Sequence, residues 1–217
     1  MNLTFDCYGT LLDTAAIETC FRQISNENHL NGSLAANVFS SYKERLMYTE
    51  AIIPFEKLIK KSLQFMDMDL KTDHLFSNHY QTIMQAYYDL KPFSEAHAVL
   101  SQLKNAGNSL YLMSNSSSRL MEHHLQALGH LFDGVFTADD TRCYKPQLDF
   151  FEFVQDQLHL NNDNHIHIAK GFWWDIVPCT KMGWRKIWIN RNHLSGLKEY
   201  QPYQELPDLS RLPEILL

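Results

Sequence analysis

The residues best suited to chemistry lie near the N-terminus, where the segment 3–13 reads Leu-Thr-Phe-Asp-Cys-Tyr-Gly-Thr-Leu-Leu-Asp. A short apolar and β-prone run stops at Asp6, as it does when a buried strand delivers one carboxylate to the carboxyl edge of a sheet. Gly9 permits a sharp turn, and Thr10 adds a hydroxyl. Open α/β sheets bind ligands beyond the carboxyl ends of their strands, so Asp6 could act as a nucleophile. The same pattern also fits a capped strand end with an Asp in a turn.

The composition is that of an ordinary folded domain. The chain has 217 residues, of which 45% are apolar and 20% charged. This length allows one large domain, or a core with a smaller insertion. A net charge of −6 disfavours nucleic acid as a partner, because phosphate backbones call for an excess of Lys and Arg. The net charge does not exclude a small anionic substrate, since the binding of such a ligand depends on the charge close to the site.

Cysteine usage and hydropathy indicate a cytoplasmic protein. Cys7, Cys20, Cys143 and Cys179 form no C-x-x-C pair and are expected to be reduced, mostly buried thiols. No run approaches the ~18 apolar residues of a membrane span. Met1 leads directly into a strand rather than into an export signal. We therefore expect neither export nor membrane insertion.

Eleven histidines raise the question of a metal site. His123 and His124 are adjacent and point in different directions on a helix. His165 and His167 alternate along a predicted strand and share one face, but no third ligand lies near them in the sequence. Surface or hydrogen-bonded histidines are the better interpretation, and no metal is predicted.

The arrangement of predicted elements defines the fold class. Residues 14–89 carry apolar residues three or four apart, typical of four helices, with no strand between them. From residue 92 onward, strands and helices alternate, which calls for a doubly wound parallel sheet. Strands are predicted at 110–113, 134–137, 165–169 and 186–189, and helices at 93–107, 116–128, 148–158 and 174–182. We expect an α/β core from 1–13 and 90–217, with 14–89 as an inserted helical cap and the C-terminal tail wrapping the surface.

If the sheet is parallel, polar residues at four strand ends meet at one edge. They are Asp6, Ser114 with Asn115, Lys145 and Asp175. Each has a structural alternative. Ser114 and Asn115 could cap a helix, Lys145 could lie in a plain loop before a helix that has Pro at its first position, and Asp175 could be an N-cap.

The segment 6–13 resembles the first motif of the haloacid dehalogenase superfamily, and Tyr8 is the form seen in its L-2-haloacid dehalogenases. The superfamily's phosphatases carry a second Asp at that position and a pair of acids in the fourth motif, where only Asp175 is acidic here. Segments similar to the later motifs are 112–116, 143–146 and 174–175 with 188–191, and 90–95 resembles the dehalogenase entry into the second core segment. The resemblance covers nearly the whole chain. It implies a Rossmann-like core with a helical cap, and an incomplete magnesium site.

The resemblance also implies a mechanism. Asp6 would attack a carbon bearing a halogen and form an ester, with Thr10 orienting it and Lys145 keeping it ionised. Asp175 would activate the water that hydrolyses the ester. No cofactor is expected. The predicted substrate-binding residues are Tyr8, Tyr42, Leu46, Ser114, Asn115, Lys170, Phe172 and Trp174.

Three positions depart from the dehalogenase pattern. The cap arginine that receives the halide aligns with Tyr42, and the nearest cations are Lys43 and Arg45. The family's Ser and Asn, five and three residues before the Asp, fall on Lys170 and Phe172. Lys170 could supply an anion-binding charge in place of the arginine. The resemblance favours dehalogenation of a short 2-haloacid and suggests a homodimer, and it leaves open a magnesium-dependent phosphoester hydrolase or a non-catalytic protein of this fold.

Overall fold

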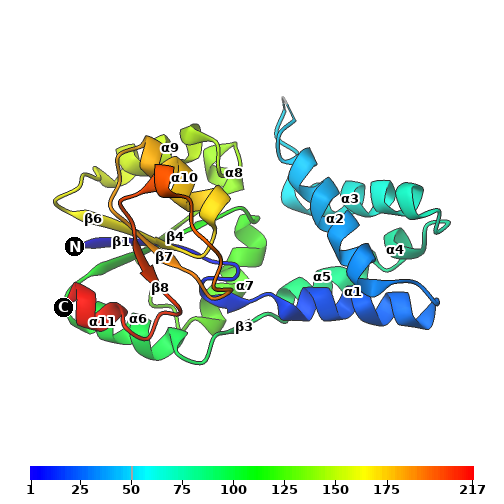
Figure 1. Ribbon diagram of the computed structural model, residues 1–217, viewed down its shortest axis with the longest axis horizontal. Helices are drawn as coiled ribbons and strands as arrows, with labels where there is room; N and C mark the ends of the chain where they lie inside the picture. The colour runs from blue at the N-terminus through cyan, green and yellow to red at the C-terminus, as the bar shows by residue number, and fades with distance from the viewer. Residues whose placement is uncertain (50) are drawn as a thin grey trace. The chain divides into compact units, whose positions relative to one another are not determined.

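The computed structural model describes residues 1–49 and 51–217 (Figure 1). The chain forms two compact units. One consists of Met1–Asp13 with Lys91–Leu217, and the other of Thr14–Leu90. We call them the core unit and the helical unit.

A six-stranded sheet, parallel throughout, organises the core unit. Its strand order is β5-β4-β1-β6-β7-β8. The strands are β1 (Asn2–Asp6), β4 (Ser109–Ser114), β5 (Gly134–Thr137), β6 (His165–Ala169), β7 (Lys186–Ile189) and β8 (Gln204–Leu206). A small antiparallel pair, β2 (Leu12–Asp13) with β3 (Lys91–Pro92), stands apart from it. The predicted α/β class with a doubly wound parallel sheet is confirmed.

Helices cover both faces of this sheet. In Figure 1, α6 and α11 lie on one side of it and α9 and α10 on the other. The helical segments of the core unit are α6 (Ala96–Asn105), α7 (Ser118–Ala127), α8 (Ala138–Thr141), α9 (Leu148–Leu158), a π-helical turn (Phe172–Ile176), α10 (Val177–Lys181), a 3₁₀ turn (Lys198–Tyr200) and α11 (Leu212–Leu216). Because both faces are covered, the central strands are nearly continuous apolar runs, and Leu3, Phe5, Leu110 and Leu112 are fully buried.

The start of α6 differs from the prediction. Gly107 follows the helix with φ of +86°, as expected for a residue beyond a helix C-terminus. The helix predicted over 93–107 starts too early, because α6 begins at Ala96 after Glu95. The backbone N–H of Phe93 donates to the carbonyl of Leu11 at 2.9 Å, which holds this segment beside the β2–β3 pair instead of in a helix.

The C-terminal tail adds a strand that the sequence did not predict. Gln204–Leu206 pairs parallel to β7, with Ile187 opposite Gln204. A strand of three residues between Pro202 and Pro207 is too short to show a period-2 pattern. Its pairing with β7 therefore decides its conformation.

The helical unit is built on a buried aromatic cluster. Phe21 lies 4.6 Å from Phe39 and 6.0 Å from Phe76, measured between ring centroids. The helices are α1 (Ala15–Glu27), α2 (Gly32–Leu46), α3 (Phe55–Leu70), α4 (Leu75–Asn78) and α5 (Tyr80–Tyr88). The last of the four helices predicted within 14–89 is divided into α4 and α5 at His79. Its ring Nδ1 bonds to the carbonyl of Leu75 at 2.8 Å, which is the acceptor that a continuous helix would need for the backbone N–H of His79.

Across residues 1–49 and 51–217, no helix has both the length and the apolar character needed to cross a membrane. All four cysteines are free thiols.

Candidate active site

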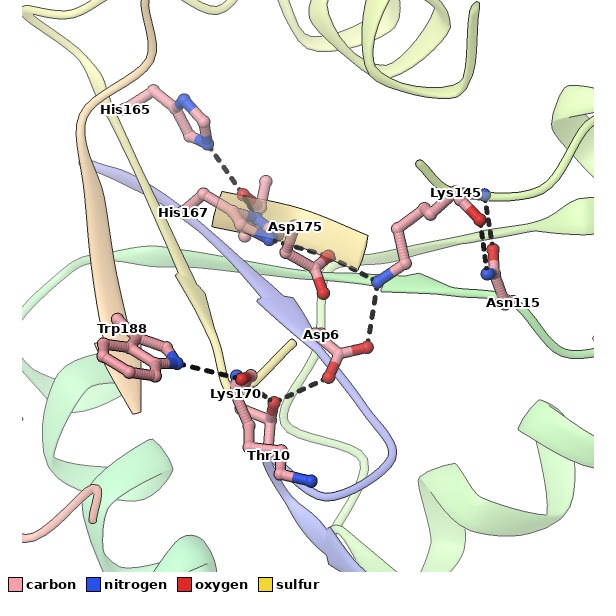
Figure 2. A network of polar contacts seen from close by, with 10 residues as sticks. Asp6, Thr10, Asn115, Lys145, His165, His167, Lys170, Asp175 and Trp188 are labelled. Atoms are coloured by element: carbon pink, nitrogen blue, oxygen red, sulfur yellow. Dashed lines mark hydrogen bonds and ion pairs between the residues drawn. The ribbon is translucent and has the colours of Figure 1, made fainter. Parts of the chain in front are cut away.

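One buried ammonium joins two carboxylates at the carboxyl edge of the sheet. Lys145 Nζ donates to Asp6 Oδ1 at 2.9 Å and to Asp175 Oδ1 at 2.6 Å (Figure 2). Asp6 ends β1, and Lys145 follows α8. The hydroxyl of Thr10 donates to the other oxygen of Asp6, Oδ2, at 2.6 Å. Four residues at strand ends or in the turns beyond them thus form one connected polar group.

Asn115 fixes the position of Lys145. Its side-chain amide donates to the carbonyl of Lys145 at 2.9 Å and accepts from the backbone N–H of Lys145 at 2.7 Å. Asn115 is therefore not the cap of α7, whose N-cap is Ser117. Ser114, also a predicted binding residue, is buried at the end of β4, and its hydroxyl has no hydrogen-bond partner among the described residues.

Asp175 lies inside the π-helical turn rather than at a helix N-cap. The backbone N–H groups of Asp175 and Ile176 both donate to the carbonyl of Gly171, at 2.9 and 3.2 Å. The helix predicted from 174 therefore begins as a wide turn at Phe172. Such turns are rare and occur most often at functional sites. The turn leaves the Asp175 side chain completely buried.

The surroundings give the two carboxylates different proton affinities. Burial and the nearby charge of Asp175 raise the pKa of Asp6, although Lys145 and Thr10 oppose the shift. Burial also acts to raise the pKa of Asp175, but Lys145 and His167 outweigh it, so this pKa lies below its usual value. Burial disfavours the charged form of Lys145, yet the two carboxylates together raise its pKa. The triad of charges therefore holds a permanent cation beside an ionised Asp175.

The turn after β1 is held from two sides. The backbone N–H of Lys170 donates to Thr10 Oγ1 at 2.8 Å, which leaves the Thr10 hydroxyl hydrogen for Asp6. Arg191, which sequence reasoning did not select, donates to the carbonyl of Thr10 at 2.9 Å and to Glu95 at 2.7 Å. Lys170 also lies over the turn, since a Cβ built on Gly9 would meet its Cδ at 3.2 Å.

The remaining predicted binding residues are distributed over both units. The Tyr8 hydroxyl forms a hydrogen bond with Ser116 Oγ at 3.1 Å. Phe172 packs its ring against Trp188, with centroids 4.8 Å apart. Trp174 is half-buried beside Gly171. Tyr42 and Leu46 belong to α2 of the helical unit, where the Tyr42 ring stacks on Phe65 at 5.3 Å.

Sequence reasoning missed a second polar chain, behind Asp175. His167 Nε2 lies 3.2 Å from Asp175 Oδ1 (Figure 2). Its Nδ1 lies 2.8 Å from the hydroxyl of Thr4. The alternation of His165 and His167 along β6 was the available signal. Their common face is directed toward Thr4 of the neighbouring strand, which the sequence could not indicate.

The residues present do not fit a magnesium ion. Magnesium prefers an octahedral shell of oxygen ligands that includes one or two carboxylates. Here Asp6 and Asp175 both direct Oδ1 at Lys145, and Tyr8 stands where a second carboxylate would be needed. Within residues 1–49 and 51–217, no three His, Cys, Asp or Glu side chains are grouped to hold a metal.

Gly171 leaves the space that Asp175 occupies. A Cβ built on Gly171 would stand 2.5 Å from Asp175 Oδ2. We expect Gly171→Ala to displace the carboxylate and to lower the free energy of unfolding by about 1–3 kcal/mol, the usual cost of overpacking. Urea unfolding measures this. In an Asp175→Ala background the same substitution should cost much less, and an equal cost in both backgrounds would contradict the clash.

Comparison with known proteins identifies the family. A sequence model of the haloacid dehalogenase-like hydrolases matches residues 2–179. The chain therefore belongs to this family, as the resemblance of its motifs predicted.

Similar proteins include several dehalogenases. The (S)-2-haloacid dehalogenase 4A of Burkholderia cepacia is 26% identical over 221 residues, which cover 98% of this chain and 93% of that protein. The crystal structure of the L-2-haloacid dehalogenase RSc1362 superposes with a TM-score of 0.86 at 21% identity, covering 99% of this chain and 97% of the other. That of the Xanthobacter autotrophicus L-2-haloacid dehalogenase with chloropropionic acid covalently bound has a TM-score of 0.76 at 17% identity, with coverage of 99% and 97%. These structures share the fold of this chain.

Proposed function

We propose that this protein hydrolyses the carbon–halogen bond of a short 2-haloacid without a metal ion, through an ester on Asp6. The observation that carries the proposal is the buried Lys145 ammonium bound to both Asp6 and Asp175. This arrangement suits a reaction in two steps. One carboxylate must be a nucleophile and the other a base, and both must be ionised although they lie out of water. The relatedness to (S)-2-haloacid dehalogenases supports the choice of substrate.

In the first step, an oxygen of Asp6 attacks the carbon that bears the halogen. A carbon–oxygen bond forms as the carbon–halogen bond breaks, and the halide leaves with the bonding electron pair. Halides are very weak bases, so the leaving group needs no proton. This is consistent with Tyr8 at the position where phosphatases carry an acid. Thr10 holds the Asp6 carboxylate in a single orientation for the attack.

In the second step, Asp175 takes a proton from water, and the oxygen of that water attacks the carbonyl carbon of the Asp6 ester. The bond between this carbon and the substrate oxygen then breaks. The departing alkoxide takes the proton from Asp175 and becomes a 2-hydroxyacid, and Asp6 loses its remaining proton to solvent. Each turnover consumes one water and releases one halide and one proton. Oδ2 of Asp175 suits this role because its lone pairs accept no hydrogen bond from the described residues.

The helical unit is proposed to be a cap domain. Tyr42 and Leu46 of this unit, and Tyr8, Ser114, Asn115 and Trp174 of the core unit, stay predicted substrate-binding residues. The expectations of a cytoplasmic homodimer also stay predictions. Four free thiols accord with a reducing compartment. Light scattering of the purified protein tests the dimer.

Halide release from L-2-chloropropionate in the presence of a chelator tests the proposal. We expect halide release by the purified protein and none by Asp6→Asn. D-2-chloropropionate is the comparison substrate in the same assay, and a generic phosphoester is tested separately in the presence of magnesium. Chelator-sensitive phosphoester hydrolysis would replace the proposal with the phosphatase alternative. If neither substrate class is turned over, a non-catalytic role is favoured.

Lys170 is the cation expected to attract the substrate carboxylate or the halide. Its side chain lies over the Gly9 turn next to Thr10 (Figure 2), and no ion-pair partner for it is found among residues 1–49 and 51–217. We expect Lys170→Ala to raise KM for L-2-chloropropionate about 10-fold, equivalent to ~1.4 kcal/mol, with a smaller change in kcat. Lys181→Ala, which removes an exposed cation of α10, is the control. An unchanged KM and unchanged halide inhibition would exclude this role.

A further inference from the structure

A buried hydrogen-bonded chain extends from Asp175 into the sheet. His167 Nε2 is 3.2 Å from Asp175 Oδ1, and His167 Nδ1 is 2.8 Å from Thr4 Oγ1. The same hydroxyl lies 2.7 Å from His165 Nε2. Thr4 stands opposite His167 in the pairing of β1 with β6, so two neighbouring strands carry this hydrogen-bonded network. All four side chains are completely buried.

The chemistry of the groups gives this chain a direction. An ionised Asp175 only accepts hydrogen bonds, so His167 Nε2 must carry the hydrogen. In a neutral ring the other nitrogen of His167 then accepts, and the Thr4 hydroxyl donates to it. Thr4 Oγ1 in turn accepts from Nε2–H of His165. Burial lowers the pKa of His165 to about 3, so this ring is neutral and its Nδ1 carries no proton.

A charged His167 would reverse the direction of the two hydrogen bonds that Thr4 forms with His167 and His165. His167 would then donate to Thr4, and Thr4 would donate to His165 Nε2. The proton of His165 would have to sit on Nδ1, which is buried and has no hydrogen-bond partner among the described residues. A buried N–H without an acceptor costs about 1–3 kcal/mol. In the arrangement in which every donor faces Asp175, Nδ1 of His165 carries a lone pair instead, and an unpaired buried acceptor occurs more often in proteins than an unpaired buried N–H.

We propose that His167, held in one tautomer by Thr4 and His165, is a positioning residue that orients Asp175 for ester hydrolysis. This inference rests on the proposed function. Lys170 and Phe172, which stand where the family has Ser and Asn, do not orient Asp175 in the described structure. The backbone of Lys170 bonds to Thr10, and the Phe172 ring packs on Trp188. His167 therefore gives Asp175 a second donor in addition to the Lys145 cation.

The two half-reactions separate this role from general stability. Because His167 acts on Asp175 and not on Asp6, His167→Ala should slow the second step alone. We expect steady-state halide release from L-2-chloropropionate to fall about 10- to 100-fold, the effect of losing one hydrogen bond to a charged group. Halide release in the first turnover should change less than about 3-fold, within the usual scatter of such effects. Intact-mass spectrometry should show the Asp6 ester accumulating.

Three further variants define the cause. His167→Gln keeps an N–H donor of similar reach and should recover much of the steady-state rate. Thr4→Val keeps the shape but removes the hydroxyl that selects the tautomer, so we expect a smaller fall than for His167→Ala. Val154→Ala truncates a fully buried core residue that takes no part in the hydrogen-bonded series from Asp175 to His165. It should lower stability while the ratio of first-turnover to steady-state rates stays at the wild-type value.

Equal slowing of both steps in His167→Ala, or no recovery with Gln, would overturn the inference. If the wild-type protein releases no halide, the proposed function fails for this substrate, and the inference is then tested by NMR of the histidine ring nitrogens. At neutral pH we expect Nε2 to be protonated and Nδ1 to be unprotonated in both His165 and His167. Another tautomer, or a charged ring, would contradict the positioning of Asp175.

Discussion

Asp175→Asn is expected to release one halide per active site from L-2-chloropropionate and then to stop. The amide has the shape of the carboxylate and can accept the hydrogen bond from Lys145, but it cannot take a proton from water. The first step should survive, because removing the Asp175 charge removes one of the influences that raise the pKa of Asp6. Asp6 therefore stays ionised and reacts once.

Rapid-quench halide analysis and intact-mass spectrometry measure this result. The trapped protein should gain the mass of the 1-carboxyethyl group of the substrate, which is attached through the carbon that bore the halogen, and peptide mapping should place it on Asp6. We expect steady-state turnover at least about 10³-fold below wild type, as for removal of an essential base. Asp6→Asn is the control and should give neither burst nor adduct. Continuous turnover by Asp175→Asn at a wild-type rate would show that Asp175 is not the base.

Lys145→Met is expected to abolish turnover and to destabilise the fold. The substitution leaves Asp6 and Asp175 buried without the cation that they share. Removing one partner of a buried ion pair costs about 3–5 kcal/mol, because the remaining charge is uncompensated. Asp6, whose pKa burial already raises, should respond by taking up a proton, and a protonated carboxyl is no nucleophile. We expect halide release at least about 10³-fold below wild type, first turnover included.

The stability of Lys145→Met should depend on pH with a defined sign. The folded variant holds Asp6 with a pKa above that of the unfolded chain, so the folded state binds more protons between these two values. Its free energy of unfolding therefore rises as pH falls through the folded-state pKa of Asp6 toward the pKa of the unfolded chain, with a limit of about 1.4 kcal/mol per pH unit. Urea unfolding at several pH values tests this against the surface control Lys181→Met. If the difference in the free energy of unfolding between Lys145→Met and the wild type did not change with pH, Asp6 would take up no proton.

Much of the core could be predicted from the sequence because its signals are local. The strands Gly134–Thr137, His165–Ala169 and Lys186–Ile189 and the helix Leu148–Leu158 appear with the predicted bounds. The meeting of Asp6 with Lys145, which lies 139 residues away, follows from parallel topology, since polar residues at successive strand ends must share one edge. The catalytic roles of these residues stay predictions.

The features that could not be predicted depend on contacts between distant segments. The π-helical turn at Asp175 arises because Gly171 leaves room for a carboxylate that is bound by Lys145 and His167. The Thr4–His167 contact requires the register between β1 and β6, which a single sequence does not contain. The division of the predicted helix at His79 likewise depends on one ring reaching a carbonyl four residues earlier.

The central claim is that Asp6 forms the bond to substrate, and a single turnover in heavy-oxygen water tests it most directly. The protein, in excess over L-2-chloropropionate, is allowed one turnover, and mass spectrometry then locates the isotope. Because water attacks the carbonyl carbon of the Asp6 ester, we expect the label in the peptide that contains Asp6, and a 2-hydroxyacid whose new oxygen is unlabelled. Label in the hydroxyl of the product and none in the protein would mean that water attacks the substrate directly, which contradicts the account.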